Sequence, residues 1–184
     1  MAQGNPSKGN PGKGNPGKGN AGNSRASERS AARLAAVQAI YQMEVSGKGV
    51  VEVTAEFEAH WIGREIEGMT FNASDMPFFR DLLSGVVREQ RAIDRATDET
   101  LAEGWPLERI EAVLRAIFRC AVFELMMRRD VPVRVVINEY VEVANAFYDG
   151  DEPGMVNGVL DAIARKTRPE DFEGKGRGQS TRQK

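Results

Sequence analysis

The sequence predicts an all-α protein, a two-lobed helical bundle with a disordered basic tail at each end. Apolar residues recur every three or four positions through most of the chain, which is the period of an amphipathic helix. No segment sustains the alternation of a half-buried strand. Residues 110–129 are apolar over well more than half of the helical circumference, so other elements must cover them on several sides. We therefore expect an N-terminal three-helix lobe, followed by a C-terminal lobe around this central buried helix.

The two ends of the chain differ from its body in charge. Residues 4–23 repeat a five-residue unit of the form GNPxK, and Gly and Pro oppose regular structure, so residues 1–23 are expected to be disordered. Residues 169–184 are expected to form a flexible basic tail. Residues 1–34 carry a net charge of +5 and residues 165–184 carry +4, although the whole chain carries −2, so the body is acidic. Such basic arms bind phosphate groups or merely keep the tails soluble.

The first two helices are predicted to open a lobe that spans residues 24–103. The first helix runs over residues 24–46 and is followed by two glycines that end it. Its apolar stripe extends as far as Val45. A second, weaker apolar pattern covers residues 50–68 and places Ile62 on the inward side.

The third helix of this lobe is predicted to begin after Asp75. Aspartate commonly caps helix N-termini, and Pro77 suits the first turn. The apolar stripe of this helix includes Phe79 and Val87. Phe78 lies about 100° from Phe79 around the helix axis, so one of the two rings is expected to face outward.

The second predicted lobe spans residues 105–168 and follows a break in the helical pattern at its N-terminal end. The central helix comes first, and a proline separates it from an amphipathic helix over residues 133–148. A turn over residues 150–153 leads to the last helix, residues 155–166. The whole helical domain would thus occupy residues 24–168.

The sequence contains no recognisable catalytic or metal-binding motif. Phosphate loops, dinucleotide fingerprints and the GxSxG, HExxH and CxxC motifs are all missing. His60 has no second histidine with which to share a metal ion, so a surface or packing role is expected. Cys120 is the only cysteine and lies in the central helix, so we expect a core residue, no disulfide and a reducing compartment. The chain is therefore not expected to be an enzyme or to carry a cofactor or metal.

The sequence also bears on cellular location. The N-terminal region has no apolar segment of the kind found in signal peptides. No run of about 18 apolar residues could span a membrane. We therefore expect a cytoplasmic protein.

Three arginines recur at four-residue spacing at the start of the first helix. Arg25, Arg29 and Arg33 would therefore lie along one side of that helix. Such a row could bind the phosphates of an RNA strand, or it could be an ordinary solvated face. The lysines of the N-terminal repeat could add a weak, salt-sensitive attraction to RNA, or they could have no measurable effect.

Five segments of the body resemble the transcription antitermination factor NusB family in order and spacing. The INE and VNGVLD strings, at fixed spacing in one chain, are the most specific part of this resemblance. It covers about residues 25–167 and leaves the two tails outside. The five segments are Ala32–Gly47, Phe78–Val87, Phe118–Leu125, Asp130–Phe147 and Met155–Arg165.

Membership of that family would imply an all-helical, two-lobed protein that catalyses nothing. Members of the family bind boxA, a short single-stranded element of nascent ribosomal RNA transcripts, together with NusE, a protein of the small ribosomal subunit. The pair joins other Nus factors on RNA polymerase and suppresses termination. An acidic body gives a physical reason for a basic ribosomal protein to dock, because complementary charge speeds encounter and selects partners.

The resemblance also implies residues for RNA binding. Arg29 and Arg33 fall on the arginine-rich start of the family's first helix, and Arg25 lies one turn earlier. Other members have a denser arginine run, which residues 30–32 interrupt here. Tyr41 matches a tyrosine of the family's RNA-binding surface, although its place in the apolar stripe is equally consistent with packing.

For partner binding the resemblance implies Leu114, Asp151 and Met155. Asp151 matches an acidic position that modulates complex assembly in the family, with a helix cap as the alternative. Leu114 stands where some members have glutamate, and Met155 stands where many have phenylalanine, so the NusE-binding surface is expected to differ in detail. We expect that surface around the central helix and the Asp151 turn.

Three functions are compatible with these features. The first is an RNA-binding antitermination adaptor. The second is an RNA-modifying enzyme, because NusB-like domains also precede methyltransferase domains, but this chain has no α/β pattern and a partner would have to supply catalysis. The third is a helical protein–protein interaction module, or a homodimer, without an RNA role.

Overall fold

The computed structural model describes residues 20–66, 69–70, 72, 75–102 and 105–173, with side chains from Arg29 onward except those of Ile66 and Met69. This part of the chain is almost entirely helical, so the predicted all-α fold is confirmed. None of its helices combines the length and apolar character that crossing a membrane requires. Most of both predicted tails lies outside the described residues. The elements are α1 (Asn20–Ser46), α2 (Val50–His60), β1 (Glu65–Ile66), β2 (Met69–Thr70), α3 (Met76–Asp98), the 3-10 turn η2 (Leu107–Arg109), α4 (Ala112–Met127), α5 (Val133–Phe147), α6 (Glu152–Thr167) and α7 (Glu170–Glu173).

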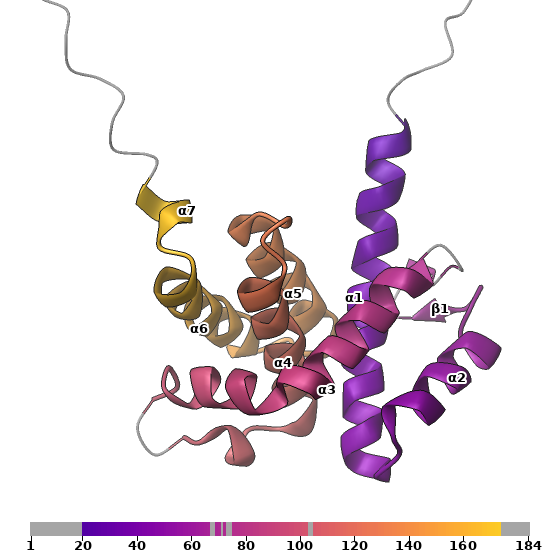
Figure 1. Cartoon of the computed structure of the whole chain (residues 1–184), viewed down its shortest axis with the longest axis horizontal. Helices are drawn as coiled ribbons and strands as arrows, with labels where there is room; N and C mark the ends of the chain where they lie inside the picture. The colour runs from indigo at the N-terminus through magenta and orange to yellow at the C-terminus, as the bar shows by residue number, and fades with distance from the viewer. Residues whose placement is uncertain (1–19, 67–68, 71, 73–74, 103–104, 174–184) are drawn as a thin grey trace, which may run out of the picture.

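Helix α4 lies at the centre of the molecule. It packs against α1, α3, α5 and α6, and Figure 1 shows these helices arranged around it. Its side chains Ile117, Phe118 and Leu125 are fully buried, and burial of each contributes about 1.5–3 kcal/mol at most. The prediction of a central buried helix is confirmed, but the helix begins at Ala112 because Ile110 still has an extended backbone (ψ 144°).

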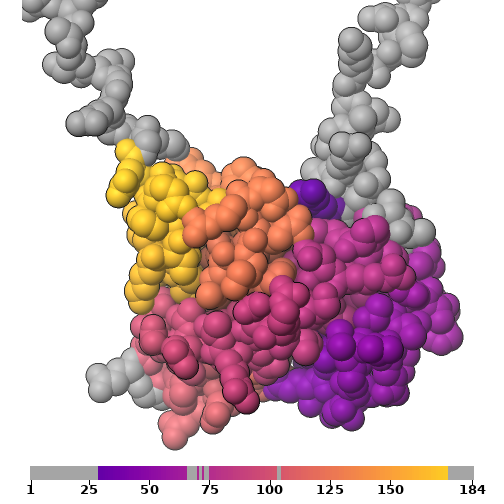
Figure 2. All heavy atoms as spheres, in the orientation of Figure 1, coloured from indigo at the N-terminus to yellow at the C-terminus, as the bar shows by residue number. Residues whose placement is uncertain are grey.

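Helix α3 crosses α1 and α4 at close range. A Cβ atom at Gly85 would lie only 2.1 Å from Cζ of Phe123 on α4, so a larger residue would require the buried Phe123 ring or the helices themselves to shift. The glycine in the middle of α3 is thus explained by packing rather than by backbone conformation. Figure 2 shows α3, in magenta, filling the front face between the indigo N-terminal and the orange and yellow C-terminal segments.

The second helix is shorter than the sequence pattern predicts. Helix α2 ends at His60 rather than at residue 68. Gly63 follows with a φ of +80°, a conformation that favours glycine, and turns the chain into the antiparallel pair β1–β2. Because each of these strands has only two residues, they leave no alternating pattern in the sequence.

Three apolar residues that were predicted to face inward are exposed. Val45 is 64% exposed, and Ile62 and Val87 are each 38% exposed, so these three assignments are wrong. Val45 lies in the last turn of α1, and Ile62 follows the end of α2. Val87 is rotated by about 100° from its buried neighbour Val86.

Several helix ends also differ from the predicted ones. Helix α1 begins at Asn20, before the predicted residue 24. Asp75 precedes α3 as predicted but makes no side-chain capping bond to it; its carboxylate instead accepts the backbone N–H of Asn72 at 2.7 Å. Helix α6 begins at Glu152, since Pro153 fits its first turn, and the short α7 occupies the start of the predicted C-terminal tail.

Candidate nucleic-acid interface

The three arginines at the start of α1 do not share one environment. Arg29 is exposed, whereas Arg33, one helical turn later, is only 2% exposed. For Arg25 the structure describes the helical backbone but not the side chain. The interpretation of a row of solvated guanidinium groups is therefore wrong for Arg33, because α1 enters the bundle between Arg29 and Ala31.

Arg33 is held by acidic side chains of α4 and α5. Its Nε and Nη2 donate to the two oxygens of Glu124 at 2.8 and 2.9 Å, and its Nη1 donates to Glu139 at 3.1 Å. The Tyr140 hydroxyl donates to Glu124 at 2.8 Å, and the Ser30 hydroxyl donates to Glu139 at 2.5 Å. Burial alone would lower the pKa of Arg33, but hydrogen bonding and the charge of Glu124 raise it above its usual value. The cluster thus keeps Arg33 charged and fixes α1 on α4 and α5.

Phe78, near the start of α3, has three guanidinium groups around its ring. The Cζ atoms of Arg29, Arg33 and Arg128 lie 5.3, 5.2 and 5.3 Å from the ring centroid. At such distances a guanidinium group is attracted to an aromatic ring. Phe79 is buried and Phe78 only half-buried, as the angle between neighbouring helix positions predicts. The ring therefore joins α1 to the C-terminal end of α4.

Carboxylates neutralise Arg128 but leave Arg29 available. The Nε and Nη2 atoms of Arg128 donate to Asp130 at 2.9 and 3.0 Å, and Nη1 donates to Asp81. Hydrogen bonding to Asp130, opposed by burial, raises the pKa of Arg128 above its usual value. In the described part of the chain no carboxylate forms an ion pair with Arg29. Of the three guanidinium groups around Phe78, Arg29 is thus the one that is free to bind an added phosphate.

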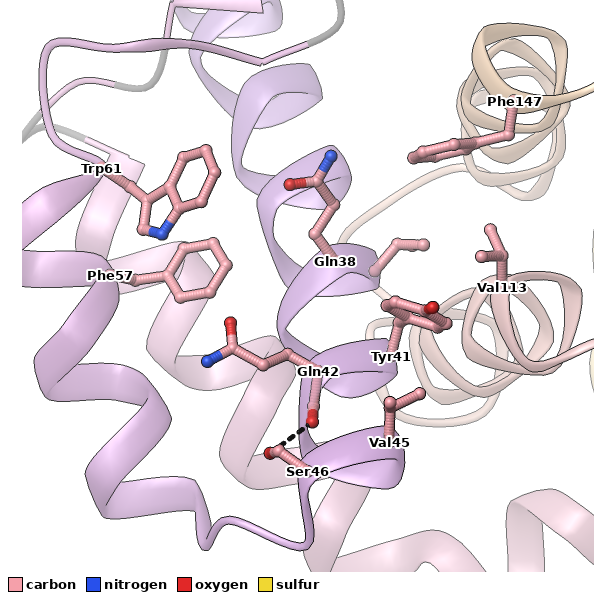
Figure 3. A pocket seen from close by; sticks show the side chains of 10 residues that line it. Gln38, Tyr41, Gln42, Val45, Ser46, Phe57, Trp61, Val113 and Phe147 are labelled. Atoms are coloured by element: carbon pink, nitrogen blue, oxygen red, sulfur yellow. Dashed lines mark hydrogen bonds between the residues drawn. The ribbon is translucent and has the colours of Figure 1, made fainter.

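Tyr41 lies twelve residues beyond Arg29, about 18 Å further along α1 at about 1.5 Å per residue. It is 38% exposed, while its neighbour Ile40 takes the buried place in the stripe. Tyr41 lines a pocket of about 410 Å³. In Figure 3 the aromatic side chains of Phe57 on α2 and of Trp61, directly after α2, lie on one side of the pocket. Val113 on α4 and Phe147 on α5 lie on the other side, nearer to Tyr41. Tyr41 and Arg29 therefore belong to separate parts of the surface.

The structure brings together the three residues that the resemblance implied for partner binding. Leu114, Asp151 and Met155 line one groove of about 550 Å³ between α4, α6 and the segment before η2. Leu114 forms its buried floor, Asp151 is exposed, and Trp105 stands 61% exposed beside them. Asp151 precedes α6 but makes no side-chain capping bond. The other charged residues that line the groove are Arg109, Glu111 and Glu152.

Sequence reasoning missed two groups of this region, the Phe78–Arg128 contact and the acids that hold Arg33. Glu124 is fully buried in a helix whose other buried residues are all apolar, and a buried carboxylate requires a cationic or hydrogen-bonding partner. That residue was a signal for an inward-facing arginine. The Phe78 contact depends on how α1, α3 and α4 cross, which no local pattern contains.

Comparisons with known proteins relate the chain to one protein family. A model of the NusB family matches residues 30–165. Transcription antitermination protein NusB of Bradyrhizobium diazoefficiens is 57% identical over 144 residues, which cover 78% of this chain and 87% of that protein. The protein of the same name from Rhodopseudomonas palustris strain HaA2 is 56% identical over 144 residues, covering 78% and 85%.

Solved structures show the same fold. T. maritima NusB superimposes with a TM-score of 0.65 at 28% identity, covering 79% of this chain and 96% of that one. A crystal structure of antitermination factors NusB and NusE in complex with dsRNA gives a TM-score of 0.63 at 25% identity, covering 76% and 97%.

Proposed function

The chain belongs to the NusB family, and we propose that it is an RNA-binding transcription antitermination adaptor. In this proposal it binds boxA single-stranded RNA of nascent ribosomal RNA transcripts together with the ribosomal protein NusE. Other Nus factors and RNA polymerase would be reached through that complex, in the cytoplasm. The protein itself catalyses no step.

The observation that carries the proposal is the exposed guanidinium of Arg29 at the edge of an acidic body. Single-stranded RNA is bound by cations along its backbone and by planar side chains against its bases. Arg29 is exposed, has no ion-pair partner among the described residues and lies over the Phe78 ring. Arg25, one turn earlier on α1, is proposed to add a second phosphate contact. Arg33 is proposed to act indirectly, because its guanidinium is buried and holds α1 in place.

Tyr41 is proposed to contact the RNA farther along α1. Its half-exposed ring borders a pocket with both aromatic and amide side chains, including Trp61 and Gln38. Unpaired bases stack on aromatic side chains and hydrogen-bond through their edges. The pocket therefore offers both kinds of contact, about 18 Å along α1 from Arg29.

The groove around Leu114, Asp151 and Met155 is proposed to receive NusE. It combines an apolar floor with exposed acids, which suits a basic ribosomal protein. A solved structure of NusB and NusE in complex with dsRNA, similar to this chain, supports the pairing. Exposed Trp105 is the kind of aromatic residue that anchors interfaces.

A titration of boxA RNA against the protein, with and without NusE, tests the proposal. We expect weak binding alone and tighter binding with NusE, and weaker binding of scrambled RNA under both conditions. In Arg29→Ala the slope of log affinity against log salt should shrink by about 0.7, the value for one lost phosphate contact on a single strand. Arg95→Ala is the matched control, since Arg95 is also exposed and lies about 25 Å along α3 from Phe78.

The NusE surface is tested separately by Asp151→Lys. This variant should weaken NusE binding while it leaves the affinity of the isolated protein for RNA unchanged. Equal affinity of the complex for boxA and scrambled RNA would contradict the proposed function. Binding without any RNA preference, together with self-association in size-exclusion chromatography, would instead favour the homodimeric interaction module.

A further inference from the structure

The arginine cluster on Phe78 is unusual because three cations converge on one aromatic ring. Their Cζ atoms lie 5.2–5.3 Å from the centroid; two of the arginines belong to α1, and the third is the residue after α4. Guanidinium groups gathered around one ring repel one another unless anions compensate their charges. The neighbouring carboxylates compensate two of the three arginines.

Two of the three guanidinium groups are fixed and neutralised. Arg33 is bound on its inner side by Glu124 and Glu139, and Arg128 is bound on the outer side by Asp81 and Asp130. These two therefore hold the Phe78 ring in place without adding net charge. Arg29 differs from both, because it is exposed and is paired with no carboxylate in the part of the chain that the structure describes.

We infer that Phe78 is a stacking platform for one unpaired nucleobase of the bound RNA, with Arg29 as its movable cover. The inference rests on the proposed function and deepens it by assigning a base contact to α3. In the free protein Arg29 lies over the ring. On binding, its guanidinium turns to the adjacent phosphate, and the base takes its place against the ring. Arg33 and Arg128 keep the ring oriented throughout.

The chemistry of the site selects single-stranded RNA. A base inside a duplex is already stacked and paired, whereas an unpaired base can be placed on an aromatic ring or a guanidinium plane. The backbone phosphate next to that base meets Arg29, which among the described residues forms no ion pair and only adds to the positive charge near Asp130. A protein side chain such as phenylalanine could use the ring, but it would bring no anion for Arg29.

A second arginine–aromatic contact in the molecule provides a control. The Cζ atom of Arg165 lies 4.5 Å from the ring centroid of Phe172, between α6 and α7. Asp161 neutralises this arginine at 2.7 Å. The pair therefore has the same contact without a free cation, and it should contribute nothing to RNA binding.

The experiment combines Phe78→Leu with an abasic scan of boxA RNA, using the full chain with NusE. Loss of one stacked base typically lowers affinity by about five- to a hundredfold. We expect a loss in this range for Phe78→Leu with an unchanged salt slope, because no charge is removed. One abasic position should cause a similar loss in wild type and no further loss in Phe78→Leu. Phe78→Tyr, which retains the ring, should bind as wild type, and so should Phe172→Leu.

The outcomes separate this inference from the function on which it rests. If Arg29→Ala weakens binding while Phe78→Leu does not, the inference fails and the RNA-binding function stands. Abasic losses that remain equally large in Phe78→Leu at every position would overturn it as well, as would a loss of NusE binding alone. If wild type shows no preference for boxA, the function itself fails. Thermal unfolding of each variant checks that a loss of affinity does not reflect a loss of folded protein.

Discussion

Replacing Arg33 by methionine tests whether the buried cluster fixes α1 on the bundle. The side chains of Arg33 and Glu124 are 2% and 0% exposed, and two hydrogen bonds of 2.8 and 2.9 Å join them. Removing the cation leaves a carboxylate in the interior with only the Tyr140 hydroxyl as a described direct partner. Breaking one partner of a buried ion pair costs about 3–5 kcal/mol.

The loss should be visible in thermal unfolding. For a chain of this size, each kcal/mol lowers Tm by about 2–4 °C, so Arg33→Met should unfold roughly 6–20 °C below wild type. Circular dichroism at 222 nm, which reports helix content, measures Tm during heating. Urea titration at pH 7 measures the free energy of unfolding. Arg80→Met is the matched control, because the ion pair of Arg80 with Glu58 is exposed and such pairs contribute about 0–1 kcal/mol.

A double variant distinguishes the loss of the whole ion pair from the cost of leaving Glu124 buried without its cation. Arg33→Met combined with Glu124→Leu removes both charges, and buried pairs replaced by apolar residues often lose little stability. The Tyr140 hydroxyl would then lack its acceptor, at a cost of about 1–3 kcal/mol, which Tyr140→Phe should recover. If Arg33→Met costs no more than the Arg80 control, or if the double variant is no more stable than the single one, the reasoning is refuted.

Three further predictions concern packing, charge and the thiol. Gly85→Ala should lower the free energy of unfolding by about 1–3 kcal/mol in urea titration, because its methyl group would overlap Phe123. Glu44 accepts hydrogen bonds from Arg115, which lower the pKa of its carboxyl against the opposing effect of burial. Glu44→Gln should therefore be less stable than wild type above about pH 5. This difference in the free energy of unfolding should vanish as the pH falls through the lowered pKa. Cys120 is fully buried, which raises the pKa of its thiol, so it should react with a disulfide reagent only after denaturant is added.

The apolar pattern of the sequence predicted the six long helices of this fold and the central place of α4, but neither the strands β1 and β2 nor the short α7. The three-to-four-residue period located α3, α4 and α5 to within a few residues, because α3 and α5 each have one strongly apolar face and α4 is apolar over most of its surface. It failed at the end of α2, where Gly63 changes the chain direction. A weakly amphipathic helix of eleven residues has too few turns for the pattern to mark its end.

The partner groove was accessible from the sequence only through the family resemblance. Leu114 and Met155 lie on different helices, and Asp151 precedes the second of them. Composition gives no reason to group the three, yet all of them line one groove. Whether NusE occupies that groove remains a prediction, which the Asp151→Lys experiment tests.

Arg33 shows what a helical period does and does not determine. The four-residue spacing correctly places Arg29 and Arg33 on one side of α1, but the boundary between solvent and core crosses that side between them. The position of the boundary is set by α4 and α5, which contribute Glu124 and Glu139. An acid in an otherwise apolar helix face indicates a buried cation elsewhere, since lone buried charges are very costly. Arginines should therefore be assigned to ligand binding only after every buried acid has been given its partner, and by that criterion Arg29 qualifies while Arg33 does not.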